Sequence, residues 1–241
     1  MHCFNIFYKR DKVFSSYVNA TGNIMLDFSK TRFKPPYLIH SDLLKTKSLI
    51  GGIESSTTDK KLAILNAHLD LLCNYLGANN LIFPSFNYDF TKTGIFDIKA
   101  SKSQVGALTN HILESNTWGR TKTPVFSFLT KISDLTKDFL LEPYGNNSVF
   151  EYLYKNDGSI ILYGSDISTC TYLHYIETAF GPPAYRYDKS FSGKIIDHNE
   201  TFNVKVSFHV RPNKIDLEYD WDMLTTNLLK NNIIQQKSTM T

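Results

Sequence analysis

Leucines recur between residues 60 and 76 at intervals of three or four residues, and this spacing constrains the fold more than any other feature of the chain. They stand at positions 62, 65, 69, 72 and 76. The spacing predicts a helix with one apolar face, capped by Asp59 and ended by Gly77. Short apolar runs flank it at Tyr37–His40 and Asn80–Pro84. A strand, a helix and a second strand in this order predict an α/β fold with a central mixed, partly parallel sheet flanked by helices.

The remainder of the chain continues the alternation of helix and strand patterns. Helices are predicted at 106–115, 148–154, 171–180 and 221–230, and strands at 124–128, at 159–164 and within 192–218. No linker divides the chain, so residues 1–241 are predicted to form a single domain. Within it, residues 1–36 are expected to be an irregular N-terminal approach and residues 231–241 a polar tail.

Composition and charge exclude several classes of protein. The chain of 241 residues is 42% hydrophobic and 20% charged, which is typical of a globular protein rather than a disordered or collagen-like one. No apolar run reaches the ~20 residues needed to cross a bilayer, and Lys9-Arg10 come too early for a secretory signal. A cytoplasmic location is therefore predicted.

The net charge of +3 forms no basic stripe, so no nucleic-acid partner is expected. The scattered cysteines at 3, 73 and 170 lack zinc-type spacing, and no metal site is expected.

An imidazole and a carboxylate stand three residues apart in the predicted helix at 171–180. On a helix, His174 and Glu177 lie on one face. A carboxylate beside an imidazole fixes its tautomer and raises its basicity, which is what a general base requires. The alternative is a pair on the helix surface that contributes a few tenths of a kcal/mol to stability. No partner at such a spacing accompanies four other histidines: His2, His111, His198 and His209.

Two further loops follow predicted strands and carry polar groups. His40 opens a strand-to-helix turn, where backbone N–H groups can meet an anion. The segment from Pro84 to Phe90 includes Tyr88 and Asp89 and mixes hydroxyl, amide, carboxylate and aromatic groups. Such a mixture suits recognition of a sugar or an amine. The alternative is an aromatic loop held by its own packing.

Five segments contain short sequence motifs beyond the helix and strand patterns: Leu38–Leu43, Asn80–Phe86, Gly106–Asn110, Arg120–Ser127 and Thr171–Glu177. In order and spacing they resemble motifs of the antibiotic N-acetyltransferase family, whose named members are the aminoglycoside 3-N-acetyltransferases. The last segment matches the family's Thr-x-x-His-x-x-Glu motif at every named position. Thr123 departs from the pattern, because the family's Arg-Ser-x-His-Pro motif has His there. Family members usually continue past the region of Leu229, so the chain is expected to be short at its C-terminal end.

The resemblance implies acetyl-coenzyme A (acetyl-CoA) as co-substrate, a primary amine as acceptor and no metal. By family analogy His174 would deprotonate the amine as it attacks the thioester, and Glu177 would orient His174. The residues expected to hold the cofactor are His40, Ser41, Ser103, Arg120 and Ser127. The residues expected on the acceptor side are Tyr88, Asp89 and Thr171.

An excess of two basic residues from Ser85 to Val125, together with the cationic and aromatic tract at residues 184–193, favours an anionic or stackable acceptor over a polycation. The segments at residues 84–90 and 185–187 also resemble family members associated with surface-polysaccharide synthesis. The main hypothesis, which this resemblance implies, is transfer to an amino sugar, nucleotide-linked and destined for surface polysaccharide. The first alternative is an aminoglycoside 3-N-acetyltransferase. A hydrolase using His174 with Ser41 or Cys170, or a catalytically inactive binding protein, completes the set. The aromatic fraction of 14% is compatible with a homodimer interface.

Overall fold

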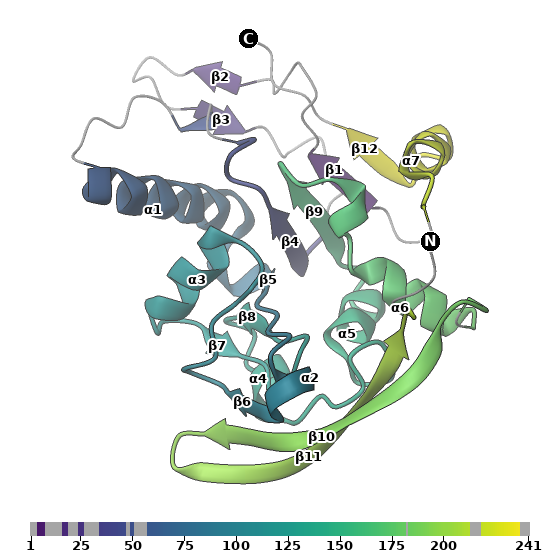
Figure 1. The fold of residues 1–241 in the computed structure, drawn as a ribbon. Coiled ribbons are helices and arrows are strands. Elements are labelled where there is room, and N and C mark those ends of the chain that lie inside the picture. Colours follow the sequence, from purple (N-terminus) through teal and green to yellow (C-terminus); the bar gives the residue numbers. More distant parts are fainter. Residues whose placement is uncertain are drawn as a thin grey trace.

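The computed structural model describes residues 4–7, 16–18, 24–26, 34–46, 49–50, 57–181, 183–212 and 218–236. Its centre is a seven-stranded sheet with the order β12-β1-β9-β4-β5-β8-β7 (Figure 1). The strands are, in that order, Ile234–Gln236, Phe4–Phe7, Ser159–Tyr163, Tyr37–Ser41, Leu81–Pro84, Phe128–Thr130 and Gly119–Arg120. Neighbours from β12 to β5 pair in parallel, whereas β8 and β7 pair antiparallel. The predicted mixed, partly parallel sheet is confirmed.

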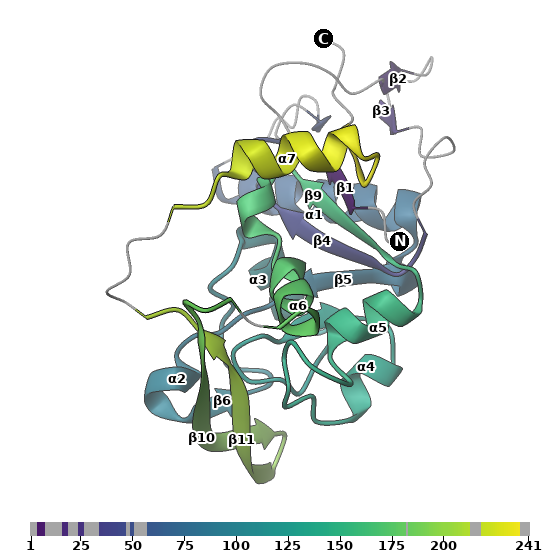
Figure 2. The same cartoon turned by 90° about the vertical axis from the view of Figure 1, so that its right-hand side faces the viewer.

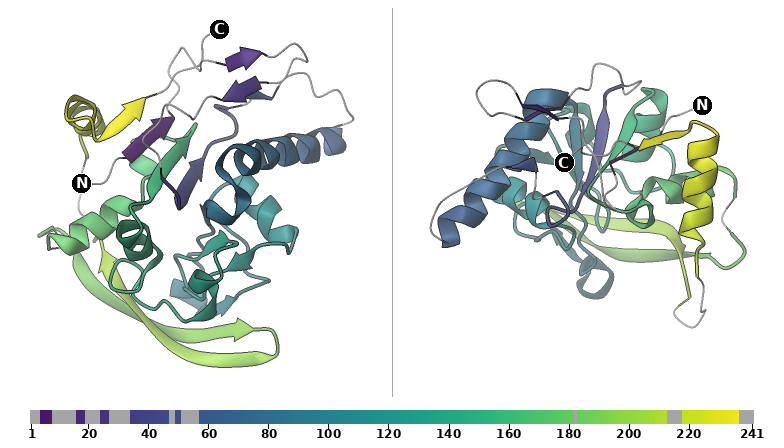
Figure 3. Two further views of the ribbon diagram at one scale, coloured as in Figure 1. Left: turned by 180° about the vertical axis from the view of Figure 1, so that it is seen from behind. Right: turned by 90° about the horizontal axis from the view of Figure 1, so that it is seen from above.

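Helices cover both faces of this sheet (Figures 1 and 3). One face carries α1 (Thr57–Leu76) and α3 (Ala107–Glu114). The other carries α5 (Val149–Lys155), α6 (Tyr172–Ala179) and α7 (Trp221–Lys230).

Alternation along the strands explains why both faces are buried. Tyr37 and Ile39 of β4 pack in the cluster that contains the leucines of α1, whereas Leu38 packs in the cluster that contains α5 and α6. A strand buried on both faces reads as a continuous apolar run, as these strands do. His40 follows in the same alternation as Leu38, so its imidazole is directed to the α6 face.

A long hairpin of β10 (Tyr187–Asp197) and β11 (Glu200–Val210) closes the lower end of the molecule (Figures 1 and 2). It adds β6 (Ile95–Asp97) in parallel to make a three-stranded sheet. Its apolar residues Ile195, Val206 and Phe208 join the α6-side core. The smaller elements are β2 (Ser16–Val18), β3 (Ile24–Leu26), α2 (Phe90–Thr93), α4 (Asp134–Lys137) and the 3-10 turns Ala78–Asn80 and Ile167–Thr169.

The two chain ends differ from expectation. Residues 1–36 were predicted to be irregular, but β1 pairs in parallel with β9 and β12, and β2 pairs with β3. Residues 231–241 were predicted to be a polar tail, but β12 lies within them. β1 and β12 are stabilised in the main sheet by partners far away in the chain, so no local sequence pattern predicted them. Among the described residues, no helix has the length and hydropathy that crossing a bilayer requires.

Candidate functional site

The site lies at the carboxyl end of β9, where the chain turns into α6. Gly164 makes the turn with φ of 73°, and a Cβ there would stand 2.5 Å from the carbonyl oxygen of Asp42. Glycine is the residue that tolerates this conformation and this close approach. The loop then runs through the 3-10 turn Ile167–Thr169 to Thr171, whose carbonyl accepts from the backbone N–H of His174 at 3.1 Å. His174 therefore stands in the first turn of α6, at the strand ends where ligands bind in open α/β sheets.

The predicted His174–Glu177 pair is formed. His174 Nδ1 lies 2.9 Å from Glu177 Oε2, and the two side chains are 30% and 20% exposed. An ionised carboxylate only accepts hydrogen bonds, so Nδ1 carries the proton and donates it. The second ring nitrogen, Nε2, is then unprotonated in the neutral imidazole. It is the atom that can remove a proton from a substrate.

The surroundings favour this charge state. Burial lowers the pKa of His174, the hydrogen bond to Glu177 opposes that effect, and the charge of Arg186 adds to it. The net direction is downward, so the imidazole is neutral near pH 7. Burial raises the pKa of Glu177, but the hydrogen bond from His174 and the charge of Arg186 outweigh it, and the net pKa is lowered. Glu177 is therefore a carboxylate when His174 is a free base.

Three more groups surround Glu177. Arg186 Nε lies 3.0 Å from Oε2, the Tyr185 hydroxyl donates to Oε1 at 3.3 Å, and His209 Nε2 lies 3.5 Å from Oε2. The Tyr144 ring packs against both imidazoles, with centroids 5.1 Å from each. Sequence reasoning missed these partners. The basic, aromatic tract that contains Tyr185 and Arg186 was interpreted as a feature of the acceptor site and not as a partner of Glu177, and His209 belongs to β11 and carries no local signal.

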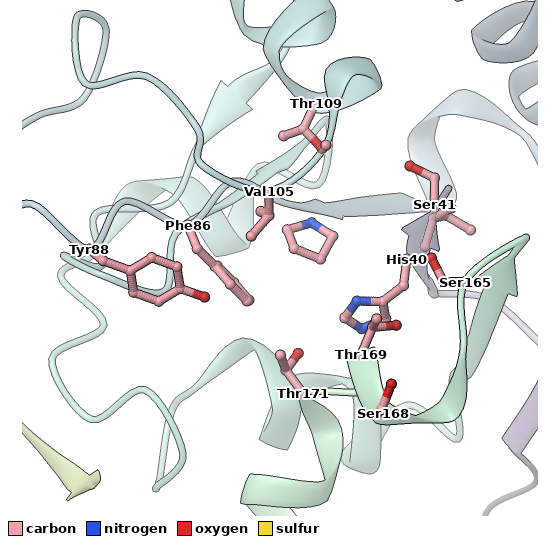
Figure 4. Close-up of a pocket in the computed structure, with 13 residues that line it drawn as sticks. His40, Ser41, Phe86, Tyr88, Val105, Thr109, Ser165, Ser168, Thr169 and Thr171 are labelled. Atoms are coloured by element: carbon pink, nitrogen blue, oxygen red, sulfur yellow. The ribbon is translucent and has the colours of Figure 1, made fainter. Parts of the chain in front are cut away.

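Two cavities meet at this point. The strand-end cavity, of about 360 Å³, brings together His40, Ser41, Tyr88 and Thr171. In Figure 4, His40 and Tyr88 point into it from opposite sides. The second, the helix cavity of about 320 Å³, is lined by His174 and Glu177 together with Arg186, Tyr219, Trp221 and Leu224. Ser168 and Thr171 line both cavities. His174 and the turn at His40 and Ser41, which was predicted to hold the cofactor, thus lie on two sides of Thr171.

His40 is a buried, neutral group facing the strand-end cavity. It is 7% exposed, and burial lowers its pKa to about 4. Its Nε2 has no hydrogen-bond partner within the described chain. The hydroxyl oxygen of Thr171 is also buried without a partner. Buried polar groups are normally bonded, so these two atoms are suited to meet a ligand.

Arg120 and Ser127 lie elsewhere. Arg120 is 5% exposed, and its guanidinium donates to Ser127 Oγ at 3.0 Å, to the Ser85 carbonyl at 2.7 Å and to the carbonyls of Ile98 and Ser101. Ser127 donates to the same Ser85 carbonyl at 2.6 Å. Neither residue lines a described cavity. This placement favours a structural role over the cofactor contact predicted for them.

The remaining predicted residues are dispersed. Ser103 lines a third, open hollow of about 620 Å³ between α1 and α3. Asp89 is exposed and accepts from Gln104 Nε2 at 3.0 Å, outside the described cavities. Thr123 is buried, and no partner for its hydroxyl is found in the described part of the chain.

The nucleophile alternatives gain no support. Burial raises the pKa of Cys170 to about 12, so its reactive thiolate is scarce at neutral pH. Ser41 lines the strand-end cavity and His174 the helix cavity, and in the described ranges no hydrogen bond joins them. Ligand atoms of His174, Glu177 and His209 lie within 4.8 Å of one another. Arg186 Nε lies 3.0 Å from Glu177 Oε2, so a metal ion held by this set would stand beside a buried positive charge, which disfavours a cation site.

Comparison with known proteins agrees with the geometry. Residues 38–240 match the model of the family described as aminoglycoside 3-N-acetyltransferase. Among solved structures, the chain resembles AAC-IIIb in binary complex with CoASH (TM-score 0.60, 17% identity, covering 83% of this chain and 79% of the other). It also resembles the aminoglycoside acetyltransferase AAC(3)-Xa (TM-score 0.58, 16% identity, coverage 85% and 79%) and YokD from Bacillus subtilis (0.53, 14%, 84% and 83%).

No sequence among the curated proteins matches the chain significantly. The family match nevertheless spans β5 to β12, the Thr-x-x-His-x-x-Glu segment and the hairpin, and it confirms the resemblance inferred from five motifs. The chain belongs to the aminoglycoside 3-N-acetyltransferase family, a family of N-acetyltransferases.

Proposed function

We propose that this protein transfers the acetyl group of acetyl-CoA to a primary amine of an amino sugar, with His174 as the general base. The observation that carries the proposal is the neutral His174, oriented by an ionised Glu177 in the lining of the helix cavity, which shares Ser168 and Thr171 with the strand-end cavity. A related structure was determined with CoASH bound, which supports acetyl-CoA as the donor.

In the proposed reaction, His174 Nε2 takes a proton from the amine as its nitrogen attacks the thioester carbonyl. The new C–N bond forms, the C–S bond breaks, and the proton passes to the departing thiolate. Glu177 stabilises the transient imidazolium through Nδ1–H. An amine is a competent nucleophile once neutral, so no covalent acyl-enzyme is required. Holding two substrates against each other supplies much of the rate.

The strand-end cavity is the proposed place for the acyl end of the donor. His40 Nε2 and the Thr171 hydroxyl are its two unpartnered buried polar atoms. Ser41 lines the same cavity. Ser103 lines a separate hollow, so a contact to a more distant part of the donor is the role left for it. We leave Arg120 and Ser127 out of the proposed cofactor set because their polar atoms are engaged with the protein itself.

The helix cavity is the proposed acceptor site. Glu177 is the sole carboxylate among its described lining residues, and it is already hydrogen-bonded to His174 and ion-paired with Arg186. Tyr219 and Trp221 form an aromatic wall, with ring centroids 4.9 Å apart. A polycation would require several free carboxylates, so this lining supports an acceptor with few positive charges.

The sequence argument for an anionic acceptor weakens in one respect. Three of the cations behind it are engaged inside the protein. Lys122 pairs with Asp197 at 2.8 Å, Arg186 pairs with Glu177, and Arg120 binds carbonyls. The nucleotide link and the surface-polysaccharide role rest on the motif resemblance and the aromatic wall. A cytoplasmic location and a homodimer stay predictions.

Two measurements test the proposal. Acetyl-CoA should raise the thermal unfolding temperature, because a ligand that binds only the folded state stabilises it. Thiol release from acetyl-CoA should then be faster with nucleotide-linked amino sugars than with gentamicin or sisomicin. The second candidate, transfer to aminoglycosides, is favoured by the family match. Acetyl transfer to an aminoglycoside, with none to the nucleotide-linked sugars, would establish it and reject the amino-sugar acceptor.

A further inference from the structure

Arg186 occupies an unusual position for a cation in a tract of exposed polar residues. Its side chain is 9% exposed and its Nε lies 3.0 Å from Glu177 Oε2, the same oxygen that accepts from His174 Nδ1 at 2.9 Å. One carboxylate oxygen therefore joins the proposed base to a buried guanidinium. A mobile surface arginine would have no such fixed relation to the site.

The rest of the arginine is also held. Arg186 Nη2 donates to the Tyr219 hydroxyl at 3.4 Å, and Tyr219 donates to Tyr185 at 3.1 Å. The guanidinium carbon stands 5.5 Å from the centre of the Tyr185 ring, a cation–π distance. The backbone N–H of Arg186 donates to the Pro183 carbonyl at 2.8 Å. The chain after α6 is thus built to present this cation to Glu177.

We infer that Arg186 is a positioning residue for the general base: it holds Glu177 as an oriented carboxylate and keeps His174 deprotonated. This inference rests on the proposed function, which assigns His174 as the base. Arg186 acts through Glu177, and a role in binding the acceptor is not needed to explain its placement.

The charges around His174 define what Arg186 changes. Facing the imidazole are Glu177 on its own helix, Arg186 after that helix, His209 on β11 and the buried phenol of Tyr144. Tyr185 and Tyr219 face Arg186 and Glu177 with neutral hydroxyls. Among the described groups facing His174, Arg186 is the permanent cation. Removing it leaves the carboxylate to act on the imidazole alone, which raises the affinity of His174 for a proton.

The test is to titrate His174 by NMR in the full-length protein labelled with ¹⁵N in its histidines. His174→Ala identifies the resonance. In Arg186→Gln the titration midpoint of His174 should rise by about one pH unit. Arg186→Lys, which keeps the cation, should stay close to the wild type. Lys194→Gln removes an exposed cation from β10 and should leave the midpoint unchanged.

A folded Arg186→Gln protein with an unshifted midpoint overturns the inference. An equal rise in Lys194→Gln also overturns it, because the effect would then belong to the net charge. If Arg186→Gln does not fold, Arg186→Lys decides, since a large rise despite a retained cation refutes the proposed role. The titration needs no acceptor. A failure of the amino-sugar proposal is therefore seen in the transfer assay and a failure of this inference in the NMR midpoint.

Discussion

Two arginines in this protein are almost equally buried, yet their partners differ in kind. Arg120 donates to Ser127 and to backbone carbonyls, and it lines no described cavity. Arg186 faces an ionised carboxylate that also holds His174, and it lines the helix cavity. Backbone carbonyls do not titrate, whereas the carboxylate of Glu177 connects the charge of Arg186 to the titratable imidazole of His174. The partner, not the arginine, decides whether the charge is structural or functional.

The largest effect should come from removing His174, the proposed base that Arg186 reaches through Glu177. His174→Ala should lower kcat/KM for acetyl transfer by about 10²–10⁴-fold, the usual contribution of a general base. Stability should change little, because Glu177 keeps its ion pair with Arg186. Thiol release from acetyl-CoA measures the rate. His198→Ala, in an exposed histidine at the hairpin turn, is the matched control. A wild-type rate in His174→Ala would remove the proposed base.

The second-largest effect should come from removing the guanidinium of Arg120, and it should be an effect on stability. Arg120→Met removes the guanidinium that donates to the carbonyls of Ile98 and Ser101 and leaves the Ser85 carbonyl with Ser127 as its side-chain donor. We expect a loss of about 3 kcal/mol in the free energy of unfolding. Urea denaturation measures it, with exposed Arg211→Met as control. Binding of acetyl-CoA to the folded fraction should be retained. Normal stability with lost donor binding would instead restore the cofactor role predicted from the sequence.

The pH dependence of the reaction sharpens the same contrast. Burial and the charge of Arg186 lower the pKa of His174 below its ordinary 6.5, although Glu177 opposes them. The base is active when neutral, so kcat/KM should hold through pH 6.5. It should fall about tenfold per pH unit only as pH drops below the lowered pKa. A rate profile over the acid range checks this. An acid limb above pH 6.5 would show that burial and Arg186 together do not outweigh Glu177 in setting the pKa of His174.

The smallest effect should come from Ser127. Its hydroxyl donates to the Ser85 carbonyl and accepts from Arg120, so Ser127→Ala should cost about 1 kcal/mol in the free energy of unfolding. Ser192→Ala, at an exposed site on β10, should be near neutral. If Ser127→Ala alters the Michaelis constant for acetyl-CoA and leaves stability intact, the network is closer to the donor than the structure indicates.

Part of the candidate site was readable from the sequence for a physical reason. His174 and Glu177 sit three residues apart, and a helix brings such a pair together whatever surrounds it. His40 was readable because a turn after a buried strand lies at the sheet edge where ligands gather. Arg120 was predicted to contact the cofactor, whereas its guanidinium donates to groups of the protein itself, because a motif position carries no information about burial. Its five donors are directed inward by contacts with segments on both sides of α2 and β6.

The sequence by itself determined the elements whose signals are local. The leucine spacing of α1 and the apolar runs of β4, β5 and β9 reappear in the structure. Such signals depend on residues only a few positions apart, so the sequence alone contains them.

Only the tertiary structure decided which distant groups share Glu177. Arg186 follows α6, His209 belongs to β11, and Tyr144 precedes α5. Their meeting depends on how the hairpin packs under the sheet, and that packing is settled by burial of apolar surface rather than by any local pattern. The division of the site into two cavities at Thr171 has the same origin.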